Sequence, residues 1–155
     1  MKSGSPPPQE GPQLKILTEF LPVGTQGHGE MVDVTTQVQS IIKKHGLKFG
    51  TVTVFCPGST GSVTTIEYEP GLKEDFPAAM ERLAPSKGQR YKHDDTWHDG
   101  NGHSHVRAST VGPSLTVPIA EGKMTLGTWQ QIVFVDWDNK PRRRDLVIQL
   151  MGTTG

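Results

Sequence analysis

The sequence predicts an α+β domain with a largely antiparallel β-sheet and inserted helices. Two observations support this fold class. Segments rich in β-branched residues, several of them alternating apolar and polar positions, recur along the chain and outnumber the segments with helical spacing. The two clearest helical segments lie between strand segments, and no internal repeat is evident.

The first half contains four strand segments. They cover residues 14–20 (LKILTEF), 30–34 (EMVDV), 48–56 (KFGTVTVFC) and 62–68 (SVTTIEY). A glycine-rich turn at 24–29 separates the first two, and the PGST turn at 57–60 separates the last two. These segments predict neighbouring strands joined by turns.

The first helix is expected to run through VQSIIKK. Thr35 or Thr36 can cap it, and Gly46 can supply the left-handed position that ends it. Its apolar face would consist of Val38, Ile41 and Ile42.

The second helix is expected over DFPAAMERLAP at 75–85, after a chain break at Pro70 and Gly71. The spacing of Phe76, Met80 and Leu83 predicts that these three side chains face inward.

The last third predicts further strands. They cover residues 114–119 (SLTVPI), 123–138 (KMTLGTWQQIVFVDWD) and 143–152 (RRDLVIQLMG). Residues 139–141 (NKP) are expected to join the last two segments as a tight hairpin.

Composition limits the domain organisation and the setting. Residues 1–13 are almost free of apolar side chains and contain three consecutive prolines, so they predict a disordered tail before a single domain at 14–155. The 16 basic residues balance the 16 acidic ones, which argues against nucleic-acid binding. No apolar run approaches the roughly 18 residues of a membrane span, and Cys56 is the single cysteine, so a cytoplasmic protein is expected.

The most informative segment is HDDTWHDGNGHSH at 93–105, predicted as an irregular loop. It holds four of the six histidines and three aspartates, which are the residue types that bind divalent metals. If GHSH is extended, His103 and His105 share one face and can bind one ion; if Ser104 caps a helix, the two rings diverge. Histidines that only accept hydrogen bonds or cap helices are the alternative.

Other segments offer groups that could complete a site. Glu67 ends an apolar strand and is either an inward carboxylate or a solvent-facing strand end. The turn with Ser59 and Thr60 can hold an anion or be a plain hairpin turn. Arg144 suits phosphate, although an ion pair is the commoner role for such an arginine. Cys56 has no basic activator and is expected to be buried and inert.

From Val32 to Gly152 the chain resembles the YjbQ-like family, also called secondary thiamine-phosphate synthases. The resemblance rests on GSTGSVTTIEYEPGLKEDF, YKHDDTWHDGNGHSHVRAS, GPSLTVPIAEGKMTLGTWQQIVFVDWD and the closing RRRDLVIQLMG. It implies a YjbQ-like homotrimeric fold with sites near subunit boundaries, a histidine-bound metal such as zinc, and a weak thiamine-phosphate synthase activity. The best family carry-overs are Glu67, His93, Asn101 and His105. Many relatives have a histidine in an H-T-S-A turn where this chain has Gly58, so His103 or His98 is a candidate replacement.

Two functions follow. The first is a metal-dependent enzyme acting on a phosphorylated small molecule, either a thiamine-phosphate synthase-like transferase or a zinc-dependent hydrolase. In it His93, His103 and His105 hold the metal, Glu67, Asp99 and Asn101 serve the chemistry, and Ser59, Thr60 and Arg144 hold phosphate. The second is a trimeric binding or structural protein whose metal has no open coordination position.

Overall fold

The computed structural model describes residues 10–155. The predicted tail therefore lies largely outside the described residues; its last part, 10–13, is exposed and belongs to no helix or strand. In this described part of the chain all strand pairs are antiparallel and four helices are inserted among the strands, which confirms the predicted α+β class. No helix within 10–155 is long and apolar enough to cross a membrane.

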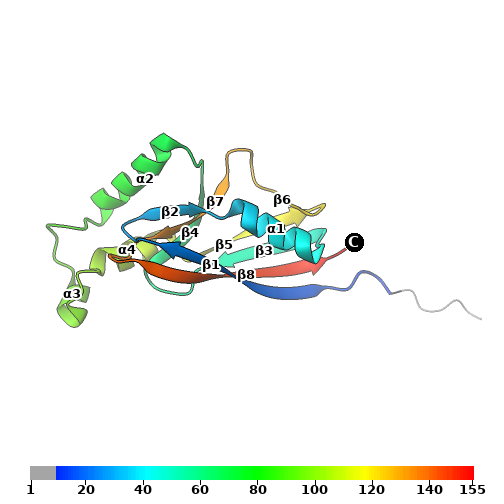
Figure 1. Ribbon diagram of the computed structural model, residues 1–155, viewed down its shortest axis with the longest axis horizontal. Coiled ribbons are helices and arrows are strands. Elements are labelled where there is room, and N and C mark those ends of the chain that lie inside the picture. The colour runs from blue at the N-terminus through cyan, green and yellow to red at the C-terminus, as the bar shows by residue number, and fades with distance from the viewer. Residues whose placement is uncertain (1–9) are drawn as a thin grey trace, which may run out of the picture.

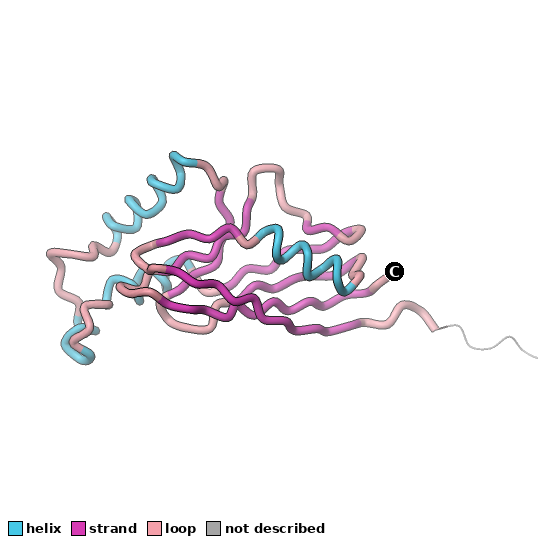
Figure 2. Tube along the Cα trace, viewed as in Figure 1, coloured by secondary structure: helices cyan, strands magenta, loops and turns pink. Residues whose placement is uncertain are grey.

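The strands form two sheets. The larger sheet has the order β1-β8-β3-β5-β6, with β1 at Lys15–Thr25, β8 at Arg142–Thr153, β3 at Phe49–Phe55, β5 at Ser114–Ala120 and β6 at Lys123–Met124. The smaller sheet has the order β2-β7-β4, with β2 at Glu30–Asp33, β7 at Gln131–Asp136 and β4 at Gly61–Ile66. Figure 2 shows the strands running through the middle of the molecule with the helices outside them.

The helices are unevenly distributed. The first, α1 at Thr35–His45, lies towards one end of the strands, whereas α2 at Pro70–Leu83, α3 at Lys92–Trp97 and α4 at Gly102–Val111 gather at the other end (Figure 1). The histidine-rich segment therefore lies at the end of the molecule that carries three helices.

The core has two parts, one on each face of the small sheet. Alternating residues on β7 decide the division, because Ile132 and Phe134 pack with α1 and the larger sheet, whereas Val133 and Val135 pack with α2 and α4. Strand β7 is consequently buried on both faces. Trp137, directly after it, lies under the Phe76 ring of α2 in an edge-to-face contact with centroids 5.6 Å apart.

Helix α1 agrees with its sequence pattern apart from its start. Val38 and Ile42 are buried, Ile41 packs partly against the same core, and Gly46 ends the helix with a φ of 66°. The predicted threonine cap is wrong, because Val34 is the N-cap residue. The carboxylate of Asp33 instead accepts hydrogen bonds from the backbone N–H and the hydroxyl of Thr35.

Helix α2 begins five residues before the predicted start. Pro70 opens the helix rather than breaking the chain, since a proline in the first turn lacks only an N–H that has no helical partner there. The Glu69 carboxylate accepts from the backbone N–H groups of Gly71 and Leu72, which caps the helix. Met80 is buried and Phe76 half-buried, but the inward prediction for Leu83 is wrong, because that side chain is exposed.

The predicted hairpin at 139–141 does not form. Strand β7 pairs with β2 and β4, whereas β8 pairs with β1 and β3, so residues 137–141 cross from one sheet to the other. The crossing places the buried carboxylate of Asp138 beside the two strand ends, which positions the site described next.

Candidate functional site

The histidine-rich segment folds into two helices rather than an irregular loop. Helix α3 carries His93 and Asp94, and it ends at His98, whose φ is 54°. Asn101 precedes α4, and the Asp94 carboxylate accepts from the backbone N–H of Gly102 at 3.0 Å. Glycine is required at 102, because a Cβ there would lie 2.4 Å from the Cβ of Tyr91. These contacts join α3 to the start of α4.

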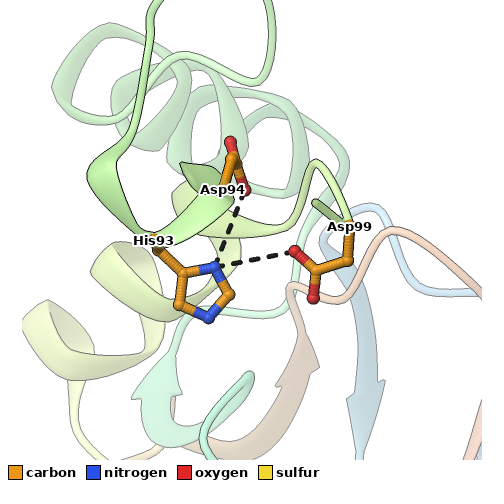
Figure 3. Close-up of side chains that lie close together, drawn as sticks. All are labelled: His93, Asp94 and Asp99. Carbon is orange, nitrogen blue, oxygen red and sulfur yellow. Dashed lines mark ion pairs between the residues drawn. The ribbon is translucent and has the colours of Figure 1, made fainter. Parts of the chain in front are cut away.

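Imidazole and carboxylate groups converge where the two helices meet. The Nδ1 atom of His93 lies 3.6 Å from Oδ1 of Asp94 and 3.6 Å from Oδ1 of Asp99, as Figure 3 shows. The His105 ring, from α4, lies against the His93 ring with centroids 4.1 Å apart. The structure thus brings together three of the predicted residues, His93, Asp99 and His105, and adds Asp94.

The Nδ1 atom of His93 is buried and has no hydrogen-bond partner among the described residues. Burial and the neighbouring His93 lower the pKa of His105, which favours the neutral imidazole that binds metals. An unpaired buried nitrogen between carboxylate oxygens is costly unless another group binds it. The cluster therefore has the character of a ligand site.

Helix geometry separates His103 from this cluster. On an α-helix, each residue is rotated by about 100° from the one before it. His103 and His105 are two residues apart, so their side chains are about 200° apart around the helix axis and point in nearly opposite directions. His103 is buried beside the ring of Tyr91, with centroids 6.4 Å apart, and burial followed by the nearby Arg107 lowers its pKa. His103 therefore does not join His105 on one ion as the extended form would allow, and the exposed His98 is not in the cluster either.

Buried charges form a second network beside the histidines. The Arg144 guanidinium donates to both carboxylate oxygens of Asp136 at 3.1 and 3.0 Å and to the Thr60 hydroxyl at 2.6 Å. Thr60 in turn donates to Asp138 at 2.9 Å, and Arg142 lies 3.2 Å from the same carboxylate. Arg144 and Thr60 are thereby engaged within the protein, so the ion-pair role is the one observed for Arg144.

Asp136 and Asp138 are the charged groups that the sequence interpretation overlooked. Both are almost fully buried, and Oδ1 of Asp138 has no hydrogen-bond partner among the described residues. Burial raises the pKa of Asp138, but the Thr60 hydroxyl and Arg142 outweigh it and hold that pKa below its usual range. The signal was present in VDWD, where carboxylates appear at the end of an otherwise apolar strand.

The remaining predicted residues take different positions. Asn101 is buried, and its side-chain oxygen accepts from the backbone N–H of Asn139 at 3.1 Å, so it ties α4 to the crossing segment. Ser59 is exposed and lines a small hollow of about 170 Å³ beside His105. Glu67 is exposed beyond the far end of β4, the strand whose first residue pairs with Asp136, so within one chain it lies away from the cluster.

Gly58, in the turn before β4, has a φ of 127°. A Cβ at this position would lie 3.0 Å from Nη1 of Arg144. The guanidinium therefore occupies part of the space into which a side chain at 58 would extend.

The fold is thus an α+β domain with two antiparallel sheets, and its candidate site is a cluster of histidines and carboxylates. Residues 19–153 match the family model described as UPF0047 protein YjbQ-like, so the chain belongs to that family.

Individual relatives agree with this assignment. A UPF0047 protein of Methanothermobacter thermautotrophicus is 34% identical over 90% of this chain and 94% of its own length. UPF0047 protein YugU of Bacillus subtilis is 32% identical over 88% of this chain and 100% of its own. A crystal structure from Sulfolobus solfataricus, described as a protein of unknown function, has a TM-score of 0.85 at 31% identity and covers 90% of this chain and 99% of its own.

Proposed function

We propose that His93, Asp94 and Asp99, whose ligand atoms lie within 4.8 Å of one another, hold a divalent metal, zinc in the first instance, with the adjacent His105 as the fourth ligand, in an enzyme that acts on a phosphorylated small molecule. The observation that carries the proposal is the buried Nδ1 of His93, which has no partner within residues 10–155 and faces two carboxylates. Nitrogen and oxygen ligands at about 2.0–2.2 Å from one zinc ion lie roughly 3.4 Å apart at tetrahedral angles. The observed separations of 3.6 Å fit that requirement.

The chain's own residues suit metal binding in a further way. Asp94 and Asp99 accept from the backbone N–H groups of Gly102 and Asn101, which fixes both carboxylates against the start of α4. His105 stands beside His93 with its ring 4.1 Å away. Asn101 is a positioning residue, because its side-chain oxygen accepts from the backbone N–H of Asn139 and its own backbone N–H donates to Asp99.

The hollow beside His105 is the proposed place for the phosphate group. Ser59 and Ser109 contribute hydroxyls, and Gly58 and Gly61 bring the backbone close. With Thr60 and Arg144 already paired, the phosphate contact is assigned to Ser59 and Ser109. A volume of about 170 Å³ is small for a whole metabolite and suits one functional group.

When bound, a zinc ion supplies a Lewis acid or lowers the pKa of a coordinated water. His105 lines the hollow, so a metal held by His105 would lie next to the proposed phosphate site. These elements serve hydrolysis at a phosphate ester, and they also serve a thiamine-phosphate synthase-like transfer with loss of pyrophosphate. Hydrolysis is favoured, because pyrophosphate departure ordinarily uses a magnesium ion with oxygen ligands.

The test combines metal analysis with turnover. Zinc titration calorimetry should give one site per chain. His93→Ala or His105→Ala should weaken zinc binding more than about 100-fold, which is a larger loss than is usual for residues that only hydrogen-bond to the metal ligands. His98→Asn is the matched control, because asparagine tolerates the left-handed backbone there and the side chain lies outside the cluster. A screen of phosphorylated metabolites, including pyrimidine pyrophosphate with thiazole phosphate, should show zinc-dependent turnover that His105→Ala abolishes. Unchanged zinc affinity in both alanine variants would contradict the site.

A binding or structural protein without turnover is the second candidate. It is favoured by the contacts of Asp94 and Asp99 with the start of α4, since a metal there would fasten α3 to α4. In that case zinc removal should lower the melting temperature, and no substrate in the screen should turn over.

We further propose that the chain forms a homotrimer through the outer face of the larger sheet. No helix of residues 10–155 covers this face, and it exposes Ile16, Phe20, Phe49, Phe55 and Met151. Of its outward residues on β1, β8, β3 and β5, only Arg143 and Asp145 are charged, and both lie at one end. Lys123 of the short edge strand β6 pairs with the outward Ala120. An apolar sheet face of this extent is typical of a surface covered by other copies.

Light scattering after gel filtration tests the assembly. The chain should have the mass of a trimer, and the double variant Phe20→Glu with Met151→Glu should have the mass of one chain. Leu83→Glu is the control, because Leu83 is equally exposed but lies on α2, away from this face. A monomeric parent chain would refute the trimer.

A cytoplasmic location is proposed from the single free thiol of Cys56. Fractionation of the source cells would test it.

A further inference from the structure

A large hollow lies at the opposite end of β7 from the histidines. It has a volume of about 720 Å³ and opens between α1, the β5–β6 turn and the segment before β7. Leu47, which is buried, and the half-buried Met124 and Leu126 provide an apolar floor. A volume of this size accommodates a whole metabolite.

Three lysines are among the residues that line it: Lys43 near the end of α1, Lys48 after it, and Lys123 on β6. We call this hollow the lysine cleft. Within residues 10–155 none of the three ammonium groups lies within 4.0 Å of a carboxylate oxygen. Lys44, one position from Lys43, is by contrast paired with Glu19 at 2.6 Å. The cleft therefore collects three positive charges against one acidic lining residue, Glu121.

The walls of the cleft are tied together by side-chain hydrogen bonds. Gln39 of α1 donates to the carbonyl of Gly122 at 2.9 Å and accepts from the N–H of Met124 at 3.1 Å. Gln130 accepts from the N–H of Gly127 at 2.8 Å, which closes the segment before β7. A cleft held in this way loses little conformational entropy when a ligand enters.

We propose that the lysine cleft binds a nucleotide, that is, an anion joining phosphate groups to a flat, largely apolar ring. The lysines receive the phosphates, since an ammonium group is a compact donor for phosphate oxygens. The ring lies on the floor of Leu47, Met124 and Leu126, and the hydroxyls of Thr36 and Ser40 line the same hollow. The cleft shares no lining residue with the histidine cluster, so this second site is independent of the metal.

Trp129 provides a signal for binding. Its side chain is 70% exposed, and it stands between Thr128 and Gln130, both of which line the cleft. A nucleotide that enters the cleft should change the fluorescence of this indole.

The experiment titrates ADP into the full chain in EDTA, by calorimetry and by tryptophan fluorescence. ADP should bind to one site per chain, more weakly as salt rises, and the triple variant Lys43→Gln, Lys48→Gln and Lys123→Gln should weaken binding by about tenfold or more. Lys44→Gln is the matched control and should bind ADP as the parent does. His105→Ala should also bind ADP normally, which separates this site from the metal site.

Competing ligands define the chemistry. Pyrophosphate should bind more weakly than ADP, and adenosine should bind more weakly still, because each lacks one of the two recognised parts. The proposal is overturned if ADP does not bind the folded protein, if the folded triple variant binds it equally well, or if the cleft proves to be closed by another copy of the chain.

Discussion

The charged side chains near the two ends of β7 differ in burial and in pairing. At its last residue and just after it, the buried Asp136 and Asp138 are paired with the half-buried Arg144, and the Nδ1 of the nearby His93 has no hydrogen-bond partner within residues 10–155. Near the other end of β7, where the strand begins, Lys43, Lys48 and Lys123 are exposed and lack acidic partners within the described chain. Buried charges must be paired because desolvation is costly, so at the histidine end they support the site without binding a ligand themselves. The exposed lysines at the other end stay hydrated and remain available to a ligand.

The largest effect should come from breaking the buried pair. Arg144→Met should lower the free energy of unfolding by about 3–5 kcal/mol, because the Asp136 carboxylate would remain buried without its guanidinium partner. Urea unfolding measures the change. Arg143→Met, on the opposite face of β8, should change it by less than about 0.5 kcal/mol, and equal losses for both variants would contradict the pairing argument.

An intermediate effect should separate the two histidines of α4. His103→Ala should cost about 1–3 kcal/mol, because it empties a buried position beside Tyr91, yet it should leave zinc affinity unchanged. His105→Ala should show the reverse pattern. Unfolding curves and zinc titrations of the same two variants test this assignment. Loss of zinc binding in His103→Ala would show that His103 is a metal ligand after all.

A smaller effect should appear at the lysine end, where Lys44 and His45 contact Glu19 at 2.6 and 2.5 Å. Hydrogen bonds from these two residues lower the pKa of Glu19 below its ordinary value of 4.5. Its stabilising contribution is therefore present above that value and is lost as pH falls through the lowered pKa. Melting temperatures of the parent and Glu19→Gln should differ slightly at pH 7 and coincide near pH 2; a constant difference would contradict this pKa shift.

The smallest effect concerns Cys56, which is buried at the charged end. Burial raises its pKa to about 11, although the nearby Arg144 acts in the opposite direction. Ellman's reagent at pH 8 should therefore react with the unfolded chain and leave the native thiol almost untouched. Faster labelling in Arg144→Met would show that the pair also keeps this end closed, whereas rapid labelling of the native parent would contradict the burial argument.

Sequence patterns predicted the elements that bury one face. The alternation in β1, β3 and β5 and the spacing of Val38 and Ile42 are local consequences of strand and helix geometry, and Gly46 ends α1 as expected. The same reasoning missed α3 and α4, because HDDTWHDGNGHSH has no apolar periodicity. Those helices are held by contacts such as Asp94 with Gly102 and Ser104 with the Trp137 carbonyl, which join distant segments.

The sequence by itself determined the α+β class, the family and the segment that carries the histidines, since all three depend on residue types and local spacing. Only the tertiary structure decided that His105 meets His93 while His103 turns away, because a helix rotates each residue by about 100° and the segment offered no pattern to reveal the helix. Only the tertiary structure paired Arg144 with Asp136 and left three lysines along one cleft without an acidic partner in the described chain. Such pairings depend on which strands become neighbours, and that choice is made by packing across the whole chain.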